Sequence, residues 1–482
     1  MHAPVQVVLV RVQVADGKAK KMTIIDRYKR MVLSSTRQPD RNQSGVSIQH
    51  FNKTNGPGSS RVHLRIDPDG SGVIFINANT IYHLNPSAIR MASLCLNDVP
   101  EDEAIKTLRA DFSVSATQLK SDYAQFSTKL NGLLEPDGGC PICDFEIETT
   151  TPFSIMPSAP YRMDLAITYR CNNACSHCYN ESLRDRMELS KQSWIEILAR
   201  LWSIGIPHIV FTGGEPTLSP DLFDLIRFAE SQGQITGLNT NGRKLKDPSF
   251  ASALVDAGLD HTQITIESHL ESIHDRMVAR DGAWKDTSRG IQNALTRKLF
   301  VMTNTTLLRE NSKCLRATLE YLADLGVPTI GLNALIYSGS GKNVGTGLDE
   351  SELPDLLEIA REITSKNKQR LIWYTPTQYC HFDPVQMQLG VKGCTAALYN
   401  MCIEPDGSVI PCQSYYSSLG NILSNPWESI WNHPLAQKLR DRALAPTKCL
   451  GCTFLPECGG GCPLESSIKE PEPRQFFYEI TS

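Results

Sequence analysis

Three cysteines stand close together in the segment Cys171-Asn-Asn-Ala-Cys175-Ser-His-Cys178. Three thiolates in one loop can bind three irons of a [4Fe–4S] cluster and leave the fourth iron open to another ligand. The alternatives are a zinc site, which normally takes four ligands, and three unrelated buried cysteines. The spacing favours the cluster, so we expect Cys171, Cys175 and Cys178 to be iron ligands.

A second group of cysteines lies toward the end of the sequence. Its last four members follow the pattern Cys-x2-Cys-x5-Cys-x3-Cys, and Gly407 stands between its first two members. The six are Cys394, Cys412, Cys449, Cys452, Cys458 and Cys462. A zinc ribbon is the alternative, but six thiols exceed what one zinc site uses. We therefore expect metal clusters in this region.

The number of thiols raises a question about the second region. Six cannot fill two [4Fe–4S] clusters that take four ligands each, so one iron stays open or another ligand is used. Cys380 and Cys402 are the leading additional ligands, because Cys380 precedes Cys394 in the same segment and Cys402 lies ten residues before Cys412. An Asp or Glu side chain is a further candidate. We expect two auxiliary clusters.

Four of the 15 cysteines remain. Cys140 and Cys143 form a Cys-x2-Cys pair, which is either a pair of reduced thiols or a set of ligands. Cys95 and Cys314 fall in helical patterns, where a cysteine is usually a small buried hydrophobe.

A glycine-rich turn, Phe211-Thr-Gly-Gly-Glu-Pro216, is the third feature with chemical potential. Gly213 and Gly214 lack side chains and would let the backbone approach a ligand closely. Glu215 can accept hydrogen bonds from an ammonium group. Alone, this turn would be ordinary, but it follows the strand after the cysteine loop.

The elements that carry these loops alternate between strand and helix. Strands are predicted at residues 163–168, 206–212, 235–239, 261–266, 300–305 and 329–335. Helices are predicted at residues 190–203, 220–232, 286–297 and 311–325. Six successive βα units indicate a parallel sheet, as in a partial or full barrel, whose functional loops follow the C-terminal ends of the strands. Short elements in residues 371–482 are typical of a metal-organised domain.

The cysteine triple and the Gly213–Pro216 turn resemble the radical S-adenosylmethionine (SAM) superfamily. Residues 239–242 (Asn-Thr-Asn-Gly) and 263–267 (Gln-Ile-Thr-Ile-Glu) continue the likeness, although Thr265 and Glu267 stand where members often have Ser and Asp. The resemblance implies that SAM chelates the open iron, with Gly213, Gly214, Glu215, Thr265 and Glu267 binding the cofactor. It also implies reductive cleavage of SAM to a 5′-deoxyadenosyl radical that abstracts hydrogen from a substrate.

The C-terminal cysteines resemble the SPASM domain, an auxiliary-cluster extension of radical SAM peptide-modifying enzymes. That family usually has a seventh cysteine after the run, whereas no cysteine follows Cys462 here. The implied fold is α/β: a partial (β/α)6 barrel at residues 161–370 and a Cys-rich domain at 371–482. The implied cofactors are SAM, its [4Fe–4S] cluster and one or two auxiliary clusters.

The N-terminal third divides into three parts. Residues 1–60 carry ten Lys and Arg against three Asp and Glu, which predicts a solvated extension or a docking arm for an acidic partner. Residues 61–135 predict a small winged-type α+β module: a hairpin of strands 61–66 and 73–77, then helices 86–96, 101–111 and 116–130. The module resembles the PqqD-like fold, in which a leader peptide adds as a strand to the sheet edge. Residues 136–160, with Cys140 and Cys143, are a linker.

The leading functional hypothesis is a radical SAM maturase of a ribosomally made peptide that carries a leader. Alternatives are an enzyme acting on a small molecule such as a haem precursor, an activator of a partner enzyme, and a non-catalytic iron–sulfur scaffold. A reductant such as flavodoxin or ferredoxin is expected. The formal charge is −4, without the basic excess that nucleic-acid binding needs. We expect no membrane span and a cytoplasmic location. No catalytic acid or base can be assigned from the sequence.

Overall fold

The computed structural model describes residues 6–10, 45–55, 58–77, 80–134, 153, 156–180, 187–297 and 299–469. The chain divides into two compact units. The N-terminal unit comprises Met1–Ser154, Leu198–Pro207 and Gln232–Ile235, and the C-terminal unit comprises the remaining residues.

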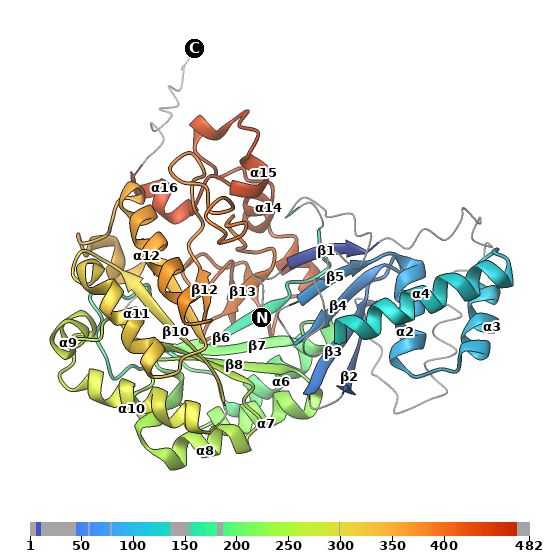
Figure 1. Ribbon diagram of the computed structural model, residues 1–482, viewed down its shortest axis with the longest axis horizontal. Helices are drawn as coiled ribbons and strands as arrows, with labels where there is room; N and C mark the ends of the chain where they lie inside the picture. The colour runs from blue at the N-terminus through green and yellow to red at the C-terminus, as the bar shows by residue number, and fades with distance from the viewer. Residues whose placement is uncertain are drawn as a thin grey trace. The chain divides into compact units, whose positions relative to one another are not determined.

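The N-terminal unit contains a five-stranded sheet of order β1-β5-β4-β3-β2 (Figure 1). Its strands are β1 (Gln6–Val10), β2 (Ser47–Asn55), β3 (Gly58–Ile66), β4 (Gly72–Ile76) and β5 (Thr80–Leu84). β1 pairs parallel to β5, and the other neighbours are antiparallel. The predicted hairpin is present as β3 and β4, with Gly70 at φ +86° in its turn.

Three helices follow the sheet: α2 (Pro86–Leu96), α3 (Glu101–Asp111) and α4 (Ala116–Leu134). The Asn85 side chain accepts the Ala88 N–H at 2.9 Å, and Pro86 occupies the first turn of α2, so this helix begins at a regular N-cap. α4 continues through Gly132, where the sequence predicted an end, because Leu130 and Leu134 are both buried in the core of the module.

Two segments of the predicted N-terminal extension, residues 1–60, belong to this sheet: β1 and β2. Ser47–Asn55 forms β2, which pairs with β3 along nine residues. Its sequence, Ser-Ile-Gln-His-Phe-Asn-Lys-Thr-Asn, is mostly polar, and the strand is specified by pairing with β3 rather than by its own pattern.

The C-terminal unit is built on a sheet of order β12-β11-β10-β9-β8-β7-β6-β13-β14-β15. The predicted strands correspond to β6 (Arg162–Thr168), β7 (His208–Gly213), β8 (Ile235–Thr240), β9 (His261–Thr265), β10 (Phe300–Leu307) and β11 (Thr329–Ala334). β6 and β7 are buried over nearly their full length, as expected for parallel strands covered on both faces. A seventh strand, β12 (Arg370–Trp373), pairs parallel to β11, so the predicted domain boundary at residue 370 falls inside an element.

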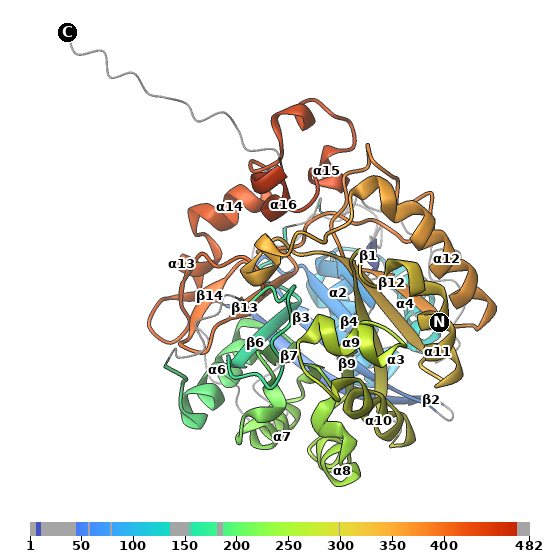
Figure 2. The same ribbon diagram turned by 90° about the vertical axis from the view of Figure 1, so that its left-hand side faces the viewer.

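Helices connect these strands and lie around the outside of the sheet, as α8, α10, α11 and α12 show in Figure 2. The connecting helices are α6 (Lys191–Ile204), α7 (Leu222–Gln232), α8 (Pro248–Asp256), α9 (Glu271–Val278), α10 (Ala283–Thr296), α11 (Leu315–Asp324) and α12 (Leu353–Lys366). The open strand order confirms the prediction of a partial α/β barrel.

The Cys-rich region shares the sheet of the barrel. β13 (Asn400–Ile403) pairs parallel to β6, and a hairpin connects it to β14 (Ser408–Ile410), which pairs with β15 (Gly420–Asn421). Gly407 lies in that hairpin at φ +86°, which explains the glycine between Cys394 and Cys412. Only short helices follow: α13 (Trp427–Trp431), α14 (Pro434–Arg440), α15 (Leu455–Cys458) and α16 (Pro463–Lys469).

Candidate functional site

The three cysteines of the first motif lie in the loop that follows β6. The backbone N–H of Asn173 donates to Cys171 Sγ at 3.4 Å, and the N–H of Cys178 donates to the carbonyl of Cys175 at 3.3 Å. Burial raises the pKa of the Cys175 thiol well above its usual value, and the charges of Cys178, Glu267 and Cys171 raise it further. The Cys175 thiol therefore interacts electrostatically with Cys171 and Cys178, and a bound cation would be needed to hold it as a thiolate. This set fits the three cysteines of a [4Fe–4S] cluster.

The cysteine loop is fixed on one side by the C-terminal end of α9. The N–H groups of Ala174 and Ser176 donate to the carbonyls of Val278 and Met277, each at 3.0 Å. Both carbonyls belong to the last turn of α9, where the carbonyl groups of a helix have no partner within the helix. The loop backbone is thereby held between two helical residues and the end of β6.

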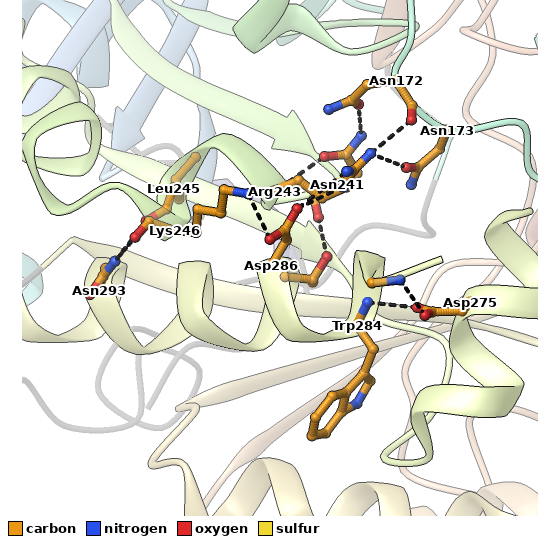
Figure 3. Close-up of polar contacts among 12 residues, drawn as sticks. Asn172, Asn173, Asn241, Arg243, Leu245, Lys246, Asp275, Trp284, Asp286 and Asn293 are labelled. Carbon is orange, nitrogen blue, oxygen red and sulfur yellow. Dashed lines mark hydrogen bonds and ion pairs between the residues drawn. The ribbon is translucent and has the colours of Figure 1, made fainter. Parts of the chain in front are cut away.

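On another side the loop is held by residues that follow β8, as Figure 3 shows. Arg243 donates to the carbonyl of Asn172 at 2.8 Å and to Asn173 Oδ1 at 3.1 Å, and Asn241 Nδ2 donates to Asn172 Oδ1 at 2.7 Å. Asp286 of α10 pairs with the Arg243 guanidinium at 3.2 Å. The Asn-Thr-Asn-Gly segment of the sequence therefore orients the cysteine loop.

Glu267, predicted to bind SAM, contacts the cysteine loop from within the protein. Its Oε1 lies 2.9 Å from Nε2 of His177, and its Oε2 accepts the Thr306 N–H at 2.9 Å. His274 Nδ1 accepts the Glu267 N–H at 3.1 Å. The Glu267 side chain is fully buried, so the structure gives it the role of positioning the loop.

Gly213 and Gly214 are required by the backbone that leads into the cysteine loop. A Cβ on Gly213 would lie 2.1 Å from the Thr168 carbonyl oxygen, and one on Gly214 would lie 2.5 Å from that of Arg170. The N–H groups of Gly214 and Glu215 donate to the carbonyls of Thr168 and Arg170, both at 2.8 Å. The sequence predicted that these glycines let the backbone approach a ligand. In the structure they let the backbone of the turn approach the backbone that follows β6.

Glu215 is buried and joins the ends of β7 and β8. Its Oε1 accepts from Thr217 Oγ1 and Thr240 Oγ1, each at 2.6 Å, and its Oε2 accepts the Asn241 N–H at 2.8 Å. Thr265, the last residue of β9, is partly buried. The predicted SAM-binding residues thus lie at the C-terminal ends of β7 and β9, the two strands on either side of β8, where barrel enzymes place their sites.

The Cys-rich region contacts the residues just after Cys178. Tyr416 donates to Asn180 Oδ1 at 2.9 Å, Asn180 Nδ2 donates to the Gly213 carbonyl at 2.6 Å, and Tyr179 donates to Gln413 Oε1 at 3.3 Å. Nearby, the Tyr169 hydroxyl donates to the buried carboxylate of Glu404. Sequence reasoning missed the contacts that Tyr169, Tyr179 and Tyr416 make, since each joins residues more than 230 positions apart.

The C-terminal cysteines separate into two sets. Burial raises the pKa of Cys412 to about 12, with Cys394 adding to the effect, and the pKa of Cys462 is raised by burial and then by Cys394 and Cys412. Burial also raises the pKa of Cys449, and the charges of Cys458, Cys380 and Cys452 follow as causes. The first set is therefore Cys394, Cys412 and Cys462, and the second is Cys380, Cys449, Cys452 and Cys458.

Among the described residues, no three His, Cys, Asp or Glu side chains converge closely enough to hold one metal ion. A [4Fe–4S] cluster binds each thiolate at a separate iron, so its ligands stand further apart than those of a single ion. The thiols of the first motif and of the two C-terminal sets interact electrostatically within each group, which agrees with the wider spacing of cluster ligands.

The other cysteines have varied surroundings. Cys402 is buried in β13 beside Ala166, Tyr169 and Ile410, and its thiol points to the Ile403 carbonyl at 3.7 Å. Cys95 and Cys314 are partly buried, and each interacts with a serine hydroxyl, at 3.2 and 3.3 Å. Cys140 and Cys143 lie outside the described residues.

Comparison with family models decides the family. Residues 165–322 match the model of the radical SAM superfamily, and residues 394–453 match that of SPASM, an iron–sulfur cluster-binding domain. The chain is a radical SAM/SPASM protein. Its cofactors are accordingly SAM, a [4Fe–4S] cluster and auxiliary clusters. The PqqD-like character of the N-terminal module stays a prediction.

The radical SAM/SPASM chain is similar to proteins of more than one activity. It is 26% identical over 325 residues to an AdoMet-dependent heme synthase of Methanosarcina barkeri (63% of this chain, 92% of that one). It is 28% identical over 316 residues to a PqqA peptide cyclase of Bradyrhizobium diazoefficiens (63% and 81%). In structure it resembles Streptococcus suis SuiB bound to its precursor peptide SuiA, with a TM-score of 0.62, 13% identity, and coverage of 83% and 94%. No described helix of this radical SAM/SPASM protein is both long and apolar enough to cross a membrane.

Proposed function

We propose that this radical SAM/SPASM enzyme modifies a ribosomally made peptide whose leader binds the N-terminal module. SAM bound to the reduced cluster supplies a 5′-deoxyadenosyl radical that removes a hydrogen atom from the substrate. In our proposal Cys171, Cys175 and Cys178 are the ligands of that cluster. A flavodoxin or ferredoxin supplies the electron.

The chain's own residues hold this site in place. His177 and Glu267, together with Arg243 and Asn241, fix the loop that carries the three cysteines. The turn from Gly213 to Glu215, at the end of β7, and Thr265, at the end of β9, are proposed to contact SAM. The loops that carry these residues follow the ends of strands and are held by buried hydrogen bonds, so the site is rigid. A rigid site can position a reactive species against one bond of the substrate.

The extent of the likeness to SuiB is the observation that carries the peptide proposal. Residues 155–482 are 328 of the 482, about 68% of the chain, whereas the match to peptide-bound SuiB covers 83%. The match must therefore extend into residues 1–154, where the five-stranded sheet and the three helices lie. A sheet with free edge strands can accept an extended peptide by strand addition, in which backbone hydrogen bonds provide the affinity.

A tetrapyrrole precursor is the second candidate substrate. The heme synthase of Methanosarcina barkeri aligns over 92% of its own length, yet over only 63% of this chain. The remaining 37% of this chain has no counterpart in that alignment.

Substrate-dependent cleavage of SAM separates the two candidates. The anaerobically reconstituted enzyme, with reductant and SAM, would be given either a short leader-bearing peptide encoded beside its gene or an iron coproporphyrin. We expect the peptide to increase the yield of 5′-deoxyadenosine several-fold and the porphyrin to leave it unchanged. Stimulation by the porphyrin alone would contradict the proposal. The Cys171→Ala, Cys175→Ala, Cys178→Ala triple variant is the control for cluster-independent cleavage.

A further inference from the structure

We propose that Cys380 is the fourth ligand of the auxiliary cluster that Cys449, Cys452 and Cys458 hold. This inference deepens the account of the SPASM region and does not depend on the substrate. Cys380 precedes the matched residues 394–453, and residues 463–482 contain no cysteine. In our proposal Cys380 is the ligand that these residues do not supply.

Backbone contacts place the segment around Cys380 against the C-terminal cysteine run. The Tyr379 N–H donates to Cys458 Sγ at 3.4 Å, and the Cys458 thiol lies 3.4 Å from the Thr377 carbonyl oxygen. A Cβ on Gly461 would lie 2.9 Å from Cγ of Gln378. Residues 377–379, which directly precede Cys380, therefore lie beside residues 458–461, although about 80 residues separate them in sequence.

The loop that carries Cys380 is anchored on both sides. Trp373 Nε1 donates to Thr377 Oγ1 at 2.9 Å, and the Lys392 N–H donates to the Tyr379 hydroxyl at 3.0 Å. His381 is hydrogen-bonded to Glu350, so the residue after Cys380 is held as well. Such contacts around a ligand fix its orientation and reduce the conformational entropy lost on binding a cluster.

Cys402 is the competing candidate, and its surroundings differ. It is 1% exposed, packs among apolar residues in β13, and has a thiol directed to a backbone carbonyl. Cys380 and Cys452 are both exposed in the chain without a cluster, Cys449 is partly buried, and Cys458 is buried. A cluster bound by these four would cover thiols that are otherwise open to solvent.

Thiol labelling of the holoprotein tests the proposal without a substitution. An exposed free thiol is alkylated by iodoacetamide, whereas a thiolate bound to iron is protected. Under anaerobic conditions we expect Cys380 to be labelled at least tenfold more slowly in the reconstituted full chain than after chelation of its iron, as judged by peptide mass spectrometry. Equal labelling rates in the two states would overturn the proposal.

Iron analysis of matched variants provides the second test. The parent is the full chain with Cys171→Ala, Cys175→Ala and Cys178→Ala, so that only auxiliary clusters contribute and the result is independent of SAM cleavage. We expect Cys380→Ala to lose between about one and four irons per chain, or to show a [3Fe–4S] signal in electron paramagnetic resonance. Cys402→Ala should keep the iron content of the parent. Loss with Cys402→Ala but not with Cys380→Ala would overturn the assignment.

If Cys380→Ala has no thermal unfolding transition, and is therefore not folded, the variant Cys380→Ser tests whether residue 380 binds iron. Serine has nearly the size of cysteine and offers an oxygen ligand, so the irons should be retained with an altered Mössbauer spectrum. A spectrum identical to that of the parent would show that residue 380 does not bind iron.

Discussion

The Nε2 atom of His177, inside the cysteine loop, lies 2.9 Å from Oε1 of Glu267 at the end of β9. Burial by itself lowers the pKa of His177, but the charge and hydrogen bond of Glu267 outweigh it, and the net shift is upward. Because both side chains are buried, this pair has little competition from water. Glu267, which the family resemblance assigned to SAM binding, thus helps to hold the loop that carries the three proposed cluster ligands.

Removing the Glu267 carboxylate is expected to destabilise the cysteine loop. Glu267→Ala leaves the Thr306 N–H and His177 without their acceptor, and breaking a buried pair costs about 3 kcal/mol. We expect a lower denaturant midpoint and loss of about four irons per chain, measured by chemical denaturation and iron analysis. The matched control is Glu271→Ala, because the pair of Glu271 with Lys285 is exposed and should contribute little. Unchanged iron content in Glu267→Ala would contradict the positioning role.

Gly214→Ala is expected to displace the cysteine loop. The added methyl group would lie 2.5 to 2.8 Å from backbone atoms of Tyr169 and Arg170, which cannot move without moving the end of β6. The 5′-deoxyadenosine yield should fall at least tenfold. Gly132→Ala in α4 is the control, since no atom lies within 4 Å of its Cβ, and helix propensity predicts a gain of up to about 1 kcal/mol. Equal activity of the two variants would refute the argument from close approach.

The stability of the N-terminal unit is expected to fall in acid because of His63. Its Nε2–H donates to the Gly233 carbonyl at 2.7 Å, and burial, with His50 and Arg61 nearby, lowers its pKa to about 3. The folded state therefore binds fewer protons than the unfolded state, whose histidine has a pKa of 6.5. This contribution is fully present above pH 6.5 and is lost as the pH falls from 6.5 toward 3.

The His63 effect amounts to about 2 kcal/mol between pH 7.5 and pH 5, since each pH unit below 6.5 costs about 1.4 kcal/mol. Guanidinium denaturation of wild type and His63→Gln at both values measures it. The variant should lose less stability on acidification than the wild type. Parallel pH dependences in the two proteins would show that His63 does not make this contribution.

The contact between the Cys-rich region and the Gly213–Glu215 turn, which we propose to bind SAM, can be tested at Tyr416. Tyr416→Phe removes the hydroxyl that donates to Asn180, whose amide in turn donates to Gly213. One lost hydrogen bond is worth about 1 kcal/mol, or roughly a fivefold effect on the rate of SAM cleavage if the site geometry relaxes. Tyr374→Phe is the control, because its hydroxyl donates to Met302 Sδ, at 3.4 Å, and not to the cysteine loop. A smaller effect for Tyr416→Phe than for Tyr374→Phe would argue against the coupling.

Local signals made much of the fold predictable. The N-cap at Asn85 and Pro86 gave the bounds of α2, and buried apolar runs located β6 to β11 within a few residues. β2 was missed because its residues are mostly polar and its position depends on pairing with β3. The pairing of β13 with β6 could not be predicted, because the two strands are more than 200 residues apart in sequence and no local pattern indicates such a pairing.

The site was predictable in its chemistry more than in its contacts. The spacing alone indicated Cys171, Cys175 and Cys178 as ligands, because one loop that binds a cluster carries its cysteines close together in the sequence. The roles of Glu267 and Cys380 could not be read in this way, as their partners, His177 and Cys449, come from other parts of the chain. His177 could have drawn notice, since it is the only histidine within the cysteine motif.

The proposal of peptide modification is tested most directly by mass spectrometry of the short peptide encoded beside this gene. The peptide would be co-expressed with the wild-type enzyme or with the Cys171→Ala, Cys175→Ala, Cys178→Ala variant, and both samples would be analysed for mass and, after growth in deuterated water, for deuterium uptake at carbon. We predict a mass decrease or a new carbon-bound deuteron in the core segment with the wild type only. A core segment that is identical in the two samples, from an enzyme that cleaves SAM, would contradict the proposal.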